Sequence, residues 1–135
     1  MTGNRGLFDS NIIIYLSKRE LPLAIVDQFD EIFISVITYM EILGYGFEDP
    51  NEEIFIKDLL SVFKTIYIDQ RIADIVVKIR KIKRIKLPDA IISATAISEG
   101  LFLVTRNIED FHDIDVKLTN PFEEKSNKST IQFIQ

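Results

Sequence analysis

Short runs of apolar residues alternate along the chain with longer segments in which apolar residues recur every three or four positions. A continuous apolar run is typical of a buried strand, and the three-to-four-residue spacing is typical of an amphipathic helix. Strands are predicted at residues 6–8, 32–36, 65–68, 101–105 and 116–118. Helices are predicted at residues 12–17, from about residue 22, after residue 38, and at residues 52–63, 70–82 and 88–99. Strands that alternate with helices predict an α/β fold with a parallel sheet.

Residues with known preferences for helix ends mark several of these boundaries. Thr38 and Asp69 are suited to cap the helices that follow them. Pro88 is suited to the first turn of its helix, and Gly100 to the position just after the last turn. The helix at residues 88–99 is apolar or small on nearly all sides, so we expect it to be buried.

Composition limits the type of protein and the type of metal site. A chain of 135 residues is long enough for one domain with its own core, here residues 1–122, followed by a polar tail at residues 123–135. It has no apolar run of membrane-spanning length and no signal-peptide pattern, and it lacks cysteine, which together suit a cytoplasmic protein. The single histidine, His112, argues against a zinc site and a Ser-His-Asp triad. Any metal must be held by oxygen atoms, which suits Mg²⁺ or Mn²⁺.

Four acidic residues stand at corresponding places on this map. Asp9 follows the first strand, and Glu41 lies in the first turn of the helix after the second strand. Asp89 lies in the first turn of the buried helix, and Asp110 lies a few residues after the strand at 101–105. Ligand sites in open parallel sheets form at the carboxyl ends of the strands. We therefore expect Asp9, Glu41 and Asp110 to lie near one another at this edge, and Asp89 joins them if its helix points its N-terminus the same way.

Each acid also has a purely structural explanation. Asp9 suits a turn, and Asp89 suits the dipole at a helix N-terminus. Thr38-x-x-Glu41 matches a capping box, in which Glu41 would hydrogen-bond the backbone of its own helix. Taken together, however, four carboxylates at one edge would repel one another, and a bound cation is the simplest remedy. The joint pattern favours a metal site held by Asp9, Glu41, Asp89 and Asp110.

Polar residues beside these acids are candidates to complete the site. Ser10 and Asn11 can hydrogen-bond carboxylate oxygens and fix their orientation, or can simply cap a helix. Asn107 can join Asp110 at the site, or can belong to a polar turn. A divalent cation on such carboxylates orients a phosphodiester, activates water and stabilises the leaving oxygen. The pattern therefore indicates a substrate that contains phosphate.

The distribution of charge agrees with such a substrate. The net charge is −5, yet residues 78–86 carry six positive charges and no acid, and this basic strip ends three residues before Asp89. Such a strip can guide a polyanion to one face, although taken on its own it is better explained by the dipole at a helix C-terminus. The residues expected to bind the polyanion are Arg80, Lys83, Arg84, Lys86 and Arg106.

Four motifs in this order resemble a known family, the PIN-domain nucleases, and within it the VapC-type toxins of toxin–antitoxin pairs. The motifs are FDSN at 8–11, TYMEI at 38–42, LPDAIISATA at 87–96, and LVTRNIEDF at 103–111 closing with NPF at 120–122. The third is the most specific, and the likeness spans residues 7–122.

The resemblance implies a three-layer α/β/α fold and a homodimeric endoribonuclease that depends on Mg²⁺ or Mn²⁺. It also implies inhibition by a cognate antitoxin whose tail enters the active-site groove. The metal ligands of the family correspond first to Asp9 and Asp89, then to Glu41 and Asp110. Many PIN domains carry an acid at the position of Asn107, so one metal is implied more strongly than two.

Three other functions remain open from the sequence, and all are less favoured. The chain can be a PIN nuclease of RNA maturation that has no antitoxin. A receiver-like phosphoacceptor domain also gathers acids around Mg²⁺, but it would need a lysine after a late strand, where this chain has Thr105-Arg106-Asn107. A non-catalytic interaction module would not need acids at all four places.

Overall fold

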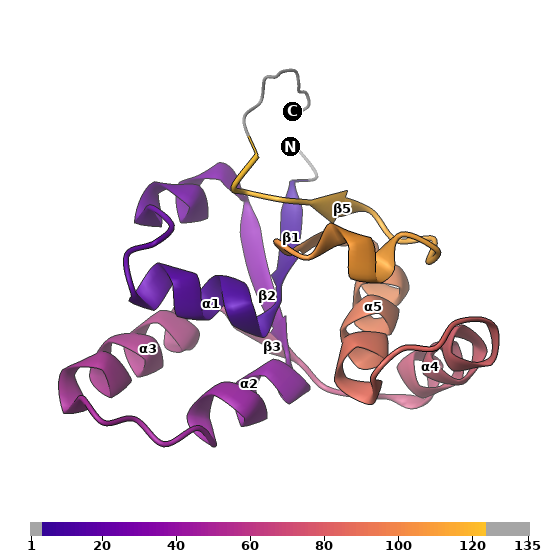
Figure 1. The fold of residues 1–135 in the computed structure, drawn as a ribbon, viewed down its shortest axis with the longest axis horizontal. Coiled ribbons are helices and arrows are strands. Elements are labelled where there is room, and N and C mark those ends of the chain that lie inside the picture. The colour runs from indigo at the N-terminus through magenta and orange to yellow at the C-terminus, as the bar shows by residue number, and fades with distance from the viewer. Residues whose placement is uncertain (1–3, 124–135) are drawn as a thin grey trace.

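A parallel sheet of five strands forms the centre of the protein (Figure 1). The computed structural model describes residues 4–123, so the predicted tail from residue 124 onward lies outside the described residues. The strand order is β3-β2-β1-β4-β5, and all neighbouring strands are parallel. The strands are β1 (Arg5–Phe8), β2 (Glu31–Ser35), β3 (Lys64–Ile66), β4 (Phe102–Val104) and β5 (Leu118–Thr119). The predicted parallel α/β fold is confirmed.

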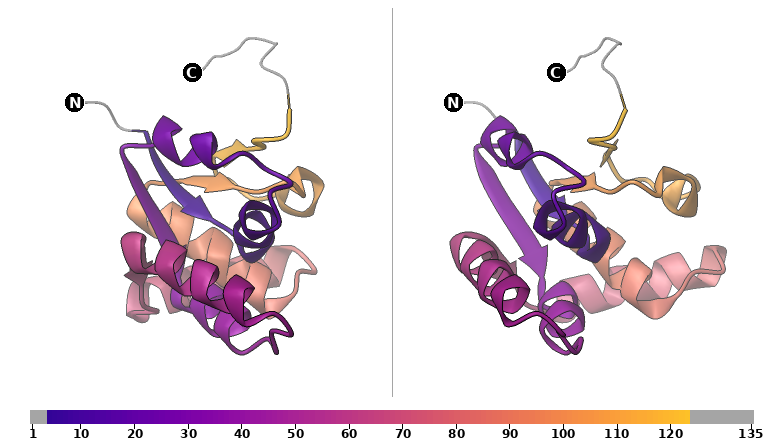
Figure 2. Two further views of the ribbon diagram at one scale, coloured as in Figure 1. Left: turned by 90° about the vertical axis from the view of Figure 1, so that its left-hand side faces the viewer. Right: turned by 60° about the vertical axis from the view of Figure 1, so that its left-hand side comes forward.

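Helices cover both faces of this sheet (Figures 1 and 2). The α-helices are α1 (Ser10–Ser17), α2 (Val36–Leu43), α3 (Pro50–Val62), α4 (Gln70–Ile82) and α5 (Leu87–Glu99), and two 3-10 helices are η1 (Leu23–Gln28) and η2 (Ile108–Phe111). Leu7 and Phe8 point to opposite faces, because successive residues of a strand alternate. Leu7 packs in a core with α4 and α5, and Phe8 packs in a second core with α1 and α3. The two cores produce the three layers that were predicted.

The order of the strands reverses at β1. β2 and β3 lie on one side of β1, whereas β4 and β5 lie on the other. The connections that leave β1 and β4 diverge from this point, which is where parallel sheets form ligand sites. Phe8 is aligned with Val104, and the backbone N–H of Asp9 donates to the carbonyl of Val104 at 3.2 Å. Asp9 and Thr105 therefore leave the sheet side by side.

The helix that carries Glu41 begins earlier than predicted. β2 ends at Ser35, and Ser35 caps α2 by accepting a hydrogen bond from the backbone N–H of Ile37 at 3.1 Å. Thr38 is fully buried within the helix, so the predicted cap at Thr38 is wrong. Glu41 lies in the second turn of α2 rather than the first, and the capping-box explanation for it does not apply.

Other predicted boundaries move by a few residues. α1 begins at Ser10 because Asp9, rather than Ser10 or Asn11, is its cap. α3 begins two residues earlier than predicted because Asp49 caps it and Pro50 suits its first turn. The helix predicted from about residue 22 is the 3-10 helix η1.

Candidate functional site

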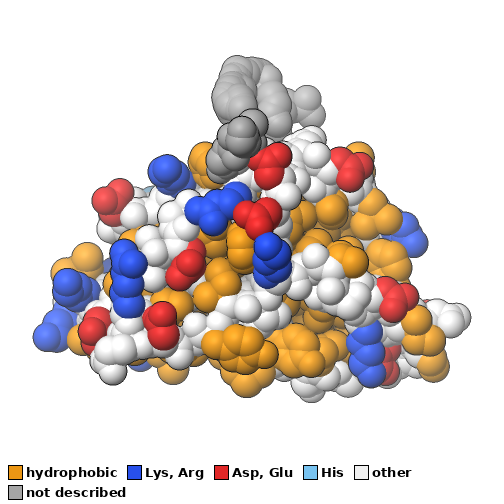
Figure 3. All heavy atoms as spheres, turned by 180° about the vertical axis from the view of Figure 1, so that it is seen from behind, with side chains coloured by type: hydrophobic (Ala, Val, Ile, Leu, Met, Phe, Trp, Pro, Cys, Tyr) orange, Lys and Arg blue, Asp and Glu red, His pale blue; other side chains and the backbone are white. Residues whose placement is uncertain are grey.

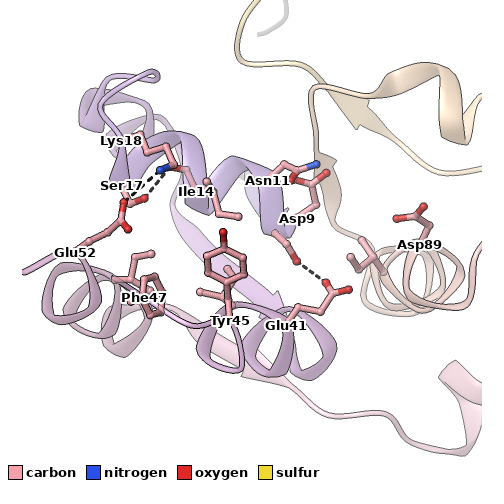
Figure 4. A pocket seen from close by; sticks show the side chains of 14 residues that line it. Asp9, Asn11, Ile14, Ser17, Lys18, Glu41, Tyr45, Phe47, Glu52 and Asp89 are labelled. Atoms are coloured by element: carbon pink, nitrogen blue, oxygen red, sulfur yellow. Dashed lines mark hydrogen bonds and ion pairs between the residues drawn. The ribbon is translucent and has the colours of Figure 1, made fainter. Parts of the chain in front are cut away.

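A cleft of about 400 Å³ opens at the carboxyl edge of the sheet, between α1, α2, α3 and α5 (Figure 4). Asp9, Glu41 and Asp89 line one end of the cleft. The other end is apolar and is lined by Ile14, Ile42, Phe47 and Ile56. Tyr45 stands between the two ends, and its hydroxyl points into the cleft.

Asp9 is the most deeply buried of these acids, with 8% of its surface exposed. Its Oδ1 accepts a hydrogen bond from the backbone N–H of Ile12 at 3.0 Å, which caps α1. Burial raises the pKa of Asp9 to about 6, even though the Thr105 hydroxyl and the Ile12 N–H lower it, and the charge of Asp89 adds to the rise. The carboxylate is thus fixed in direction and is costly to ionise without a counter-charge.

Asp89 lies half-buried in the first turn of α5, facing the same end of the cleft. Burial raises the pKa of Asp89, and the carboxylates of Asp110 and Glu41 raise it further, whereas Lys86 lowers it. Like charges act on a pKa in this way only when they are close. The other three acids that the sequence singled out therefore all lie near Asp89, close enough for their charges to act on it or to feel its charge.

Glu41 is exposed, and Ser10 holds its carboxylate in place. Ser10 Oγ donates a hydrogen bond to Glu41 Oε1 at 2.7 Å and lies 3.5 Å from Thr38 Oγ1. This contact joins the first residue of α1 to the second turn of α2. Ser10 therefore has the orienting contact that was predicted for it.

The opposite end of the cleft is closed by an ion pair between α1 and α3. Lys18 Nζ lies 3.5 Å from Glu52 Oε2, and both residues line the cleft. Between this pair and the acids, the rings of Tyr45 and Phe47 meet edge to face with 6.0 Å between their centroids. The cleft is therefore acidic at one end and apolar and aromatic toward the other, where the ion pair closes it.

Residues 7–117 match the family model of the PIN domain. The chain belongs to the PIN-domain family. A solved structure described as a toxin–antitoxin complex from Klebsiella pneumoniae contains a chain that is 37% identical, with a TM-score of 0.71, and the match covers 88% of this PIN domain chain and 99% of the other. For VapBC-1 from nontypeable Haemophilus influenzae the identity is 26%, the TM-score 0.75, and the coverage again 88% and 99%.

FitAcB from Neisseria gonorrhoeae shares the fold of this PIN domain at 24% identity, with a TM-score of 0.72 and coverage of 88% and 99%. No curated protein sequence matches the chain. The family model and the structural relatives confirm the resemblance to VapC-type PIN domains. In residues 4–123 no helix is long and apolar enough to cross a membrane.

The acids of this PIN domain suit a hard cation by their chemistry. Among the described residues, no three His, Cys, Asp or Glu side chains already converge as ligands of one ion. Mg²⁺ does not require such a cage, because it usually keeps several waters and binds one or two carboxylates. Asp9 and Asp89 offer that pair of oxygen donors, and burial together with neighbouring carboxylates raises the pKa of both acids.

Thr105 belongs to the site of this PIN domain, although it was not among the residues predicted from the sequence. It is fully buried, its hydroxyl hydrogen-bonds Asp9, and its Oγ1 accepts from the backbone N–H of Asn107 at 3.1 Å. Asn107 in turn accepts from the backbone N–H of Asp110 at 3.1 Å. Thr105 thus connects the two acids that follow β1 and β4.

The remaining predicted site residues have different surroundings. Asn11 is exposed and lines the cleft, whereas Asn107 and Asp110 are exposed outside the lining of the described cleft.

Arg80, Arg84 and Lys86 are exposed at the end of α4 and in the following loop. The side chain of Lys83 is only 15% exposed and lies 3.9 Å from Asp113. Arg106 stands apart from these residues, because its guanidinium lies over two aromatic rings.

Proposed function

We propose that this PIN domain is a Mg²⁺- or Mn²⁺-dependent endoribonuclease that serves as the toxin of a VapBC-type toxin–antitoxin pair. The observation that carries the proposal is the burial of Asp9 beside Asp89, with Glu41 and Asp110 close enough to raise the pKa of Asp89. Holding like charges together in a folded protein lowers its stability. Functional sites commonly carry such a stability cost, and a divalent cation would offset it.

Each residue of the group has a role in this proposal. Asp9 and Asp89 would hold the cation, with Glu41 and Asp110 completing its surroundings. When bound, a cation of this kind activates water and stabilises the charge that develops on the phosphate. Thr105 fixes the direction of Asp9, and Ser10 fixes that of Glu41, which is open to water in the cleft and can accept a proton from it.

The exposed residues Arg80, Arg84 and Lys86 would bind the RNA backbone beside the acids. We call residues 80–86, at the end of α4 and after it, the basic loop. Lys86 is close enough to Asp89 to lower the pKa of that acid, so an RNA strand bound along the basic loop reaches the acidic end of the cleft. Lys83 contributes less in this proposal, because its side chain is mostly covered and faces Asp113.

The toxin assignment is supported by the solved relatives, which are described as a toxin–antitoxin complex and as VapBC-1. A cognate antitoxin with a basic and apolar segment would complement a cleft that is acidic at one end and apolar at the other. A homodimer in the cytoplasm is part of the same proposal.

A PIN nuclease of RNA maturation would use the same acids without an inhibitor. A small reading frame immediately upstream that encodes a DNA-binding protein with a basic tail would favour the toxin over the maturation nuclease.

Cleavage of single-stranded RNA by purified protein tests the catalytic proposal. Activity should disappear in EDTA and return with Mg²⁺ or Mn²⁺ but not with Ca²⁺ alone. Asp9→Asn should abolish it, whereas Asp58→Asn, which removes an exposed acid from α3, should not. Undiminished cleavage in excess EDTA contradicts the proposal.

Expression in cells without a partner tests the toxin role. The parent protein should slow growth, and Asp9→Asn or Asp89→Asn should relieve the inhibition at equal abundance. If both variants inhibit growth as strongly as the parent, the acids are not the source of toxicity.

A further inference from the structure

Three side chains from distant parts of the chain stack on one another beside the acidic site. The guanidinium of Arg106 lies 4.4 Å from the ring centroid of Phe122 and 5.4 Å from that of Tyr15. The two rings meet edge to face at 4.9 Å. Tyr15 belongs to α1, Arg106 follows β4, and Phe122 follows β5. We call these three residues the Arg106 clamp.

The backbone around the clamp is also tied together. Asn120 Nδ2 donates to the carbonyl of Arg106 at 3.4 Å, and Asn120 Oδ1 accepts from the backbone N–H of Phe122 at 2.9 Å. One side chain thus fixes Phe122 and the backbone of Arg106 at the same time. The segment after β5 is held against the turn after β4 through both main-chain and side-chain contacts.

That turn carries the fourth acid. Arg106 lies between Thr105, which hydrogen-bonds Asp9, and Asn107, whose carbonyl accepts from the backbone N–H of Asp110. Asn107 N–H donates back to Thr105 Oγ1 across Arg106. A change in the backbone at Arg106 would therefore move Asp110 relative to Asp9.

A guanidinium is well suited to such a clamp. Its planar, delocalised cation stacks on aromatic faces and is weakly hydrated, whereas the ammonium of a lysine is compact and strongly hydrated. Arg106 is engaged by two rings, unlike Arg84, for which the structure gives no ion pair or ring contact among residues 4–123. An arginine whose only role was to bind phosphate would not need contacts with two aromatic rings.

We propose that Arg106 is a positioning residue that holds the Asp110 turn against α1 through Tyr15 and Phe122, and so sets the metal affinity of the acids, instead of binding RNA. The proposal rests on the proposed function for the metal, but the clamp itself concerns the folded chain alone. Loss of a group that orients a metal ligand typically weakens metal binding about 10- to 100-fold.

The test compares four variants of the full chain. Arg106→Met removes the charge and the stacking cation, Arg106→Lys keeps the charge but not the planar group, and Phe122→Leu removes a ring of the clamp. Arg84→Met is the matched control, because it removes an exposed cation of the basic loop. The measurements are amide hydrogen exchange at residues 107–111 in EDTA, Mn²⁺ affinity from thermal titration, and the salt dependence of binding to single-stranded RNA in EDTA.

We expect all three clamp variants to exchange faster at residues 107–111 and to bind Mn²⁺ roughly tenfold more weakly. Their RNA salt slopes should equal that of the parent. Arg84→Met should instead lower the slope by about 0.7 and leave Mn²⁺ affinity and exchange unchanged.

Two results overturn the proposal. One is an Arg106→Met variant whose salt slope falls by about 0.7 while exchange and Mn²⁺ affinity stay at parental values, which makes Arg106 a phosphate ligand. The other is unchanged exchange in Phe122→Leu. If the parent binds no Mn²⁺, the metal site of the proposed function fails, and the exchange measurement in EDTA still decides whether the clamp holds the turn.

Discussion

Ser10 Oγ donates a hydrogen bond to Glu41 Oε1 at 2.7 Å, so the first residue of α1 controls the direction of an acid on α2. Ser10→Ala should slow RNA cleavage roughly tenfold, as expected when a partner that orients an active-site group is lost. Its melting temperature should change little, because Glu41 is exposed and hydrogen bonds of this kind contribute only about 1 kcal/mol to stability. Cleavage kinetics and thermal melts provide the two measurements.

Ser61→Ala is the matched control for this prediction. Ser61 Oγ donates to the carbonyl of Asp58 at 2.6 Å within α3, and neither residue lines the cleft. An equal loss of activity in both serine variants would show that orientation of Glu41 is not the cause.

The raised pKa of Asp9 predicts how stability depends on pH in metal-free protein. The folded state holds a proton on Asp9 up to about pH 6, whereas the ordinary pKa of an aspartate is 3.8. Between these values the folded state binds more protons than the unfolded state, so the free energy of unfolding falls as pH rises. The raised pKa of Asp9 therefore contributes about 3 kcal/mol to the free energy of unfolding below about pH 4, and this contribution is lost above about pH 6.

Urea unfolding in EDTA from pH 4 to pH 7 measures this contribution as a difference between the parent and Asp9→Asn. Asparagine keeps the cap of α1 but does not titrate. The stability of the parent relative to the variant should decrease as pH rises. A difference that stays constant over this range would show that Asp9 ionises normally.

Asp89→Asn distinguishes a metal site from a helix-capping acid. In EDTA the variant should melt at or above the parental temperature, because one of several repelling charges is removed. In Mn²⁺ the order should reverse, since the parent gains about 2.7 kcal/mol at a hundredfold excess over Kd and the variant gains little. If Asp89 served only the dipole of α5, its loss would lower stability by a few tenths to about 1 kcal/mol under both conditions.

Asp69→Asn provides the control for this comparison. Asp69 caps α4, with its Oδ1 accepting from the backbone N–H of Ile72 at 2.9 Å, and it is not part of the cleft. Asp69→Asn should lose the same small amount of stability with and without Mn²⁺, and Mn²⁺ should stabilise it as much as it stabilises the parent. An Asp89→Asn protein that behaves like Asp69→Asn would falsify the metal assignment.

The basic loop should determine how RNA affinity depends on salt. Arg80→Gln together with Arg84→Gln should lower the slope of affinity against salt by about 1.4, because each neutralised phosphate of a single strand contributes about 0.7. Lys83→Gln should change the slope less, since its side chain is mostly covered and lies near Asp113. Filter binding in EDTA over a range of salt gives the slopes.

Arg71→Gln is the control for the loop variants, because Arg71 is exposed at the opposite end of α4. Its slope should match that of the parent. If it falls as far as the loop variants do, RNA binds to the general charge of α4 and not to the loop.

The sequence predicts best where a local signal determines the structure. α5 begins with Pro88 in its first turn and ends at Gly100, whose φ of 68° favours glycine, as expected. The start of α2 was predicted three residues late, because Ser35 and Thr38 are both good caps and the apolar residues between them fit a strand as well as a helix. Only the packing of the folded chain decides between the two caps.

The acidic site could be predicted in outline for a geometric reason. Parallel strands bring their carboxyl ends to one edge, so the positions of Asp9 and Glu41 after strands were enough to place them there, and Asp89 joins them because the N-terminus of α5 lies at the same edge. Thr105 was missed because its role depends on the register that aligns Phe8 with Val104. The contacts of Arg106 were missed because they join residues 15, 106 and 122.

The central position of β1 has a consequence for the protein during its synthesis. Leu7 of β1 pairs with Leu103 of β4, and Thr105 N–H donates to the carbonyl of Thr119, so the earliest strand of this sheet to be synthesised cannot complete its pairing until one of the latest has been made. Translation at about 5–20 residues per second makes this wait several seconds long. A nascent chain carries Asp9, Glu41 and Asp89 without the strand that brings Asp110 to them. Under the proposed function, a chain released before β4 is made would lack both Asp110 and the central pairing of the sheet, and we expect it not to cut RNA.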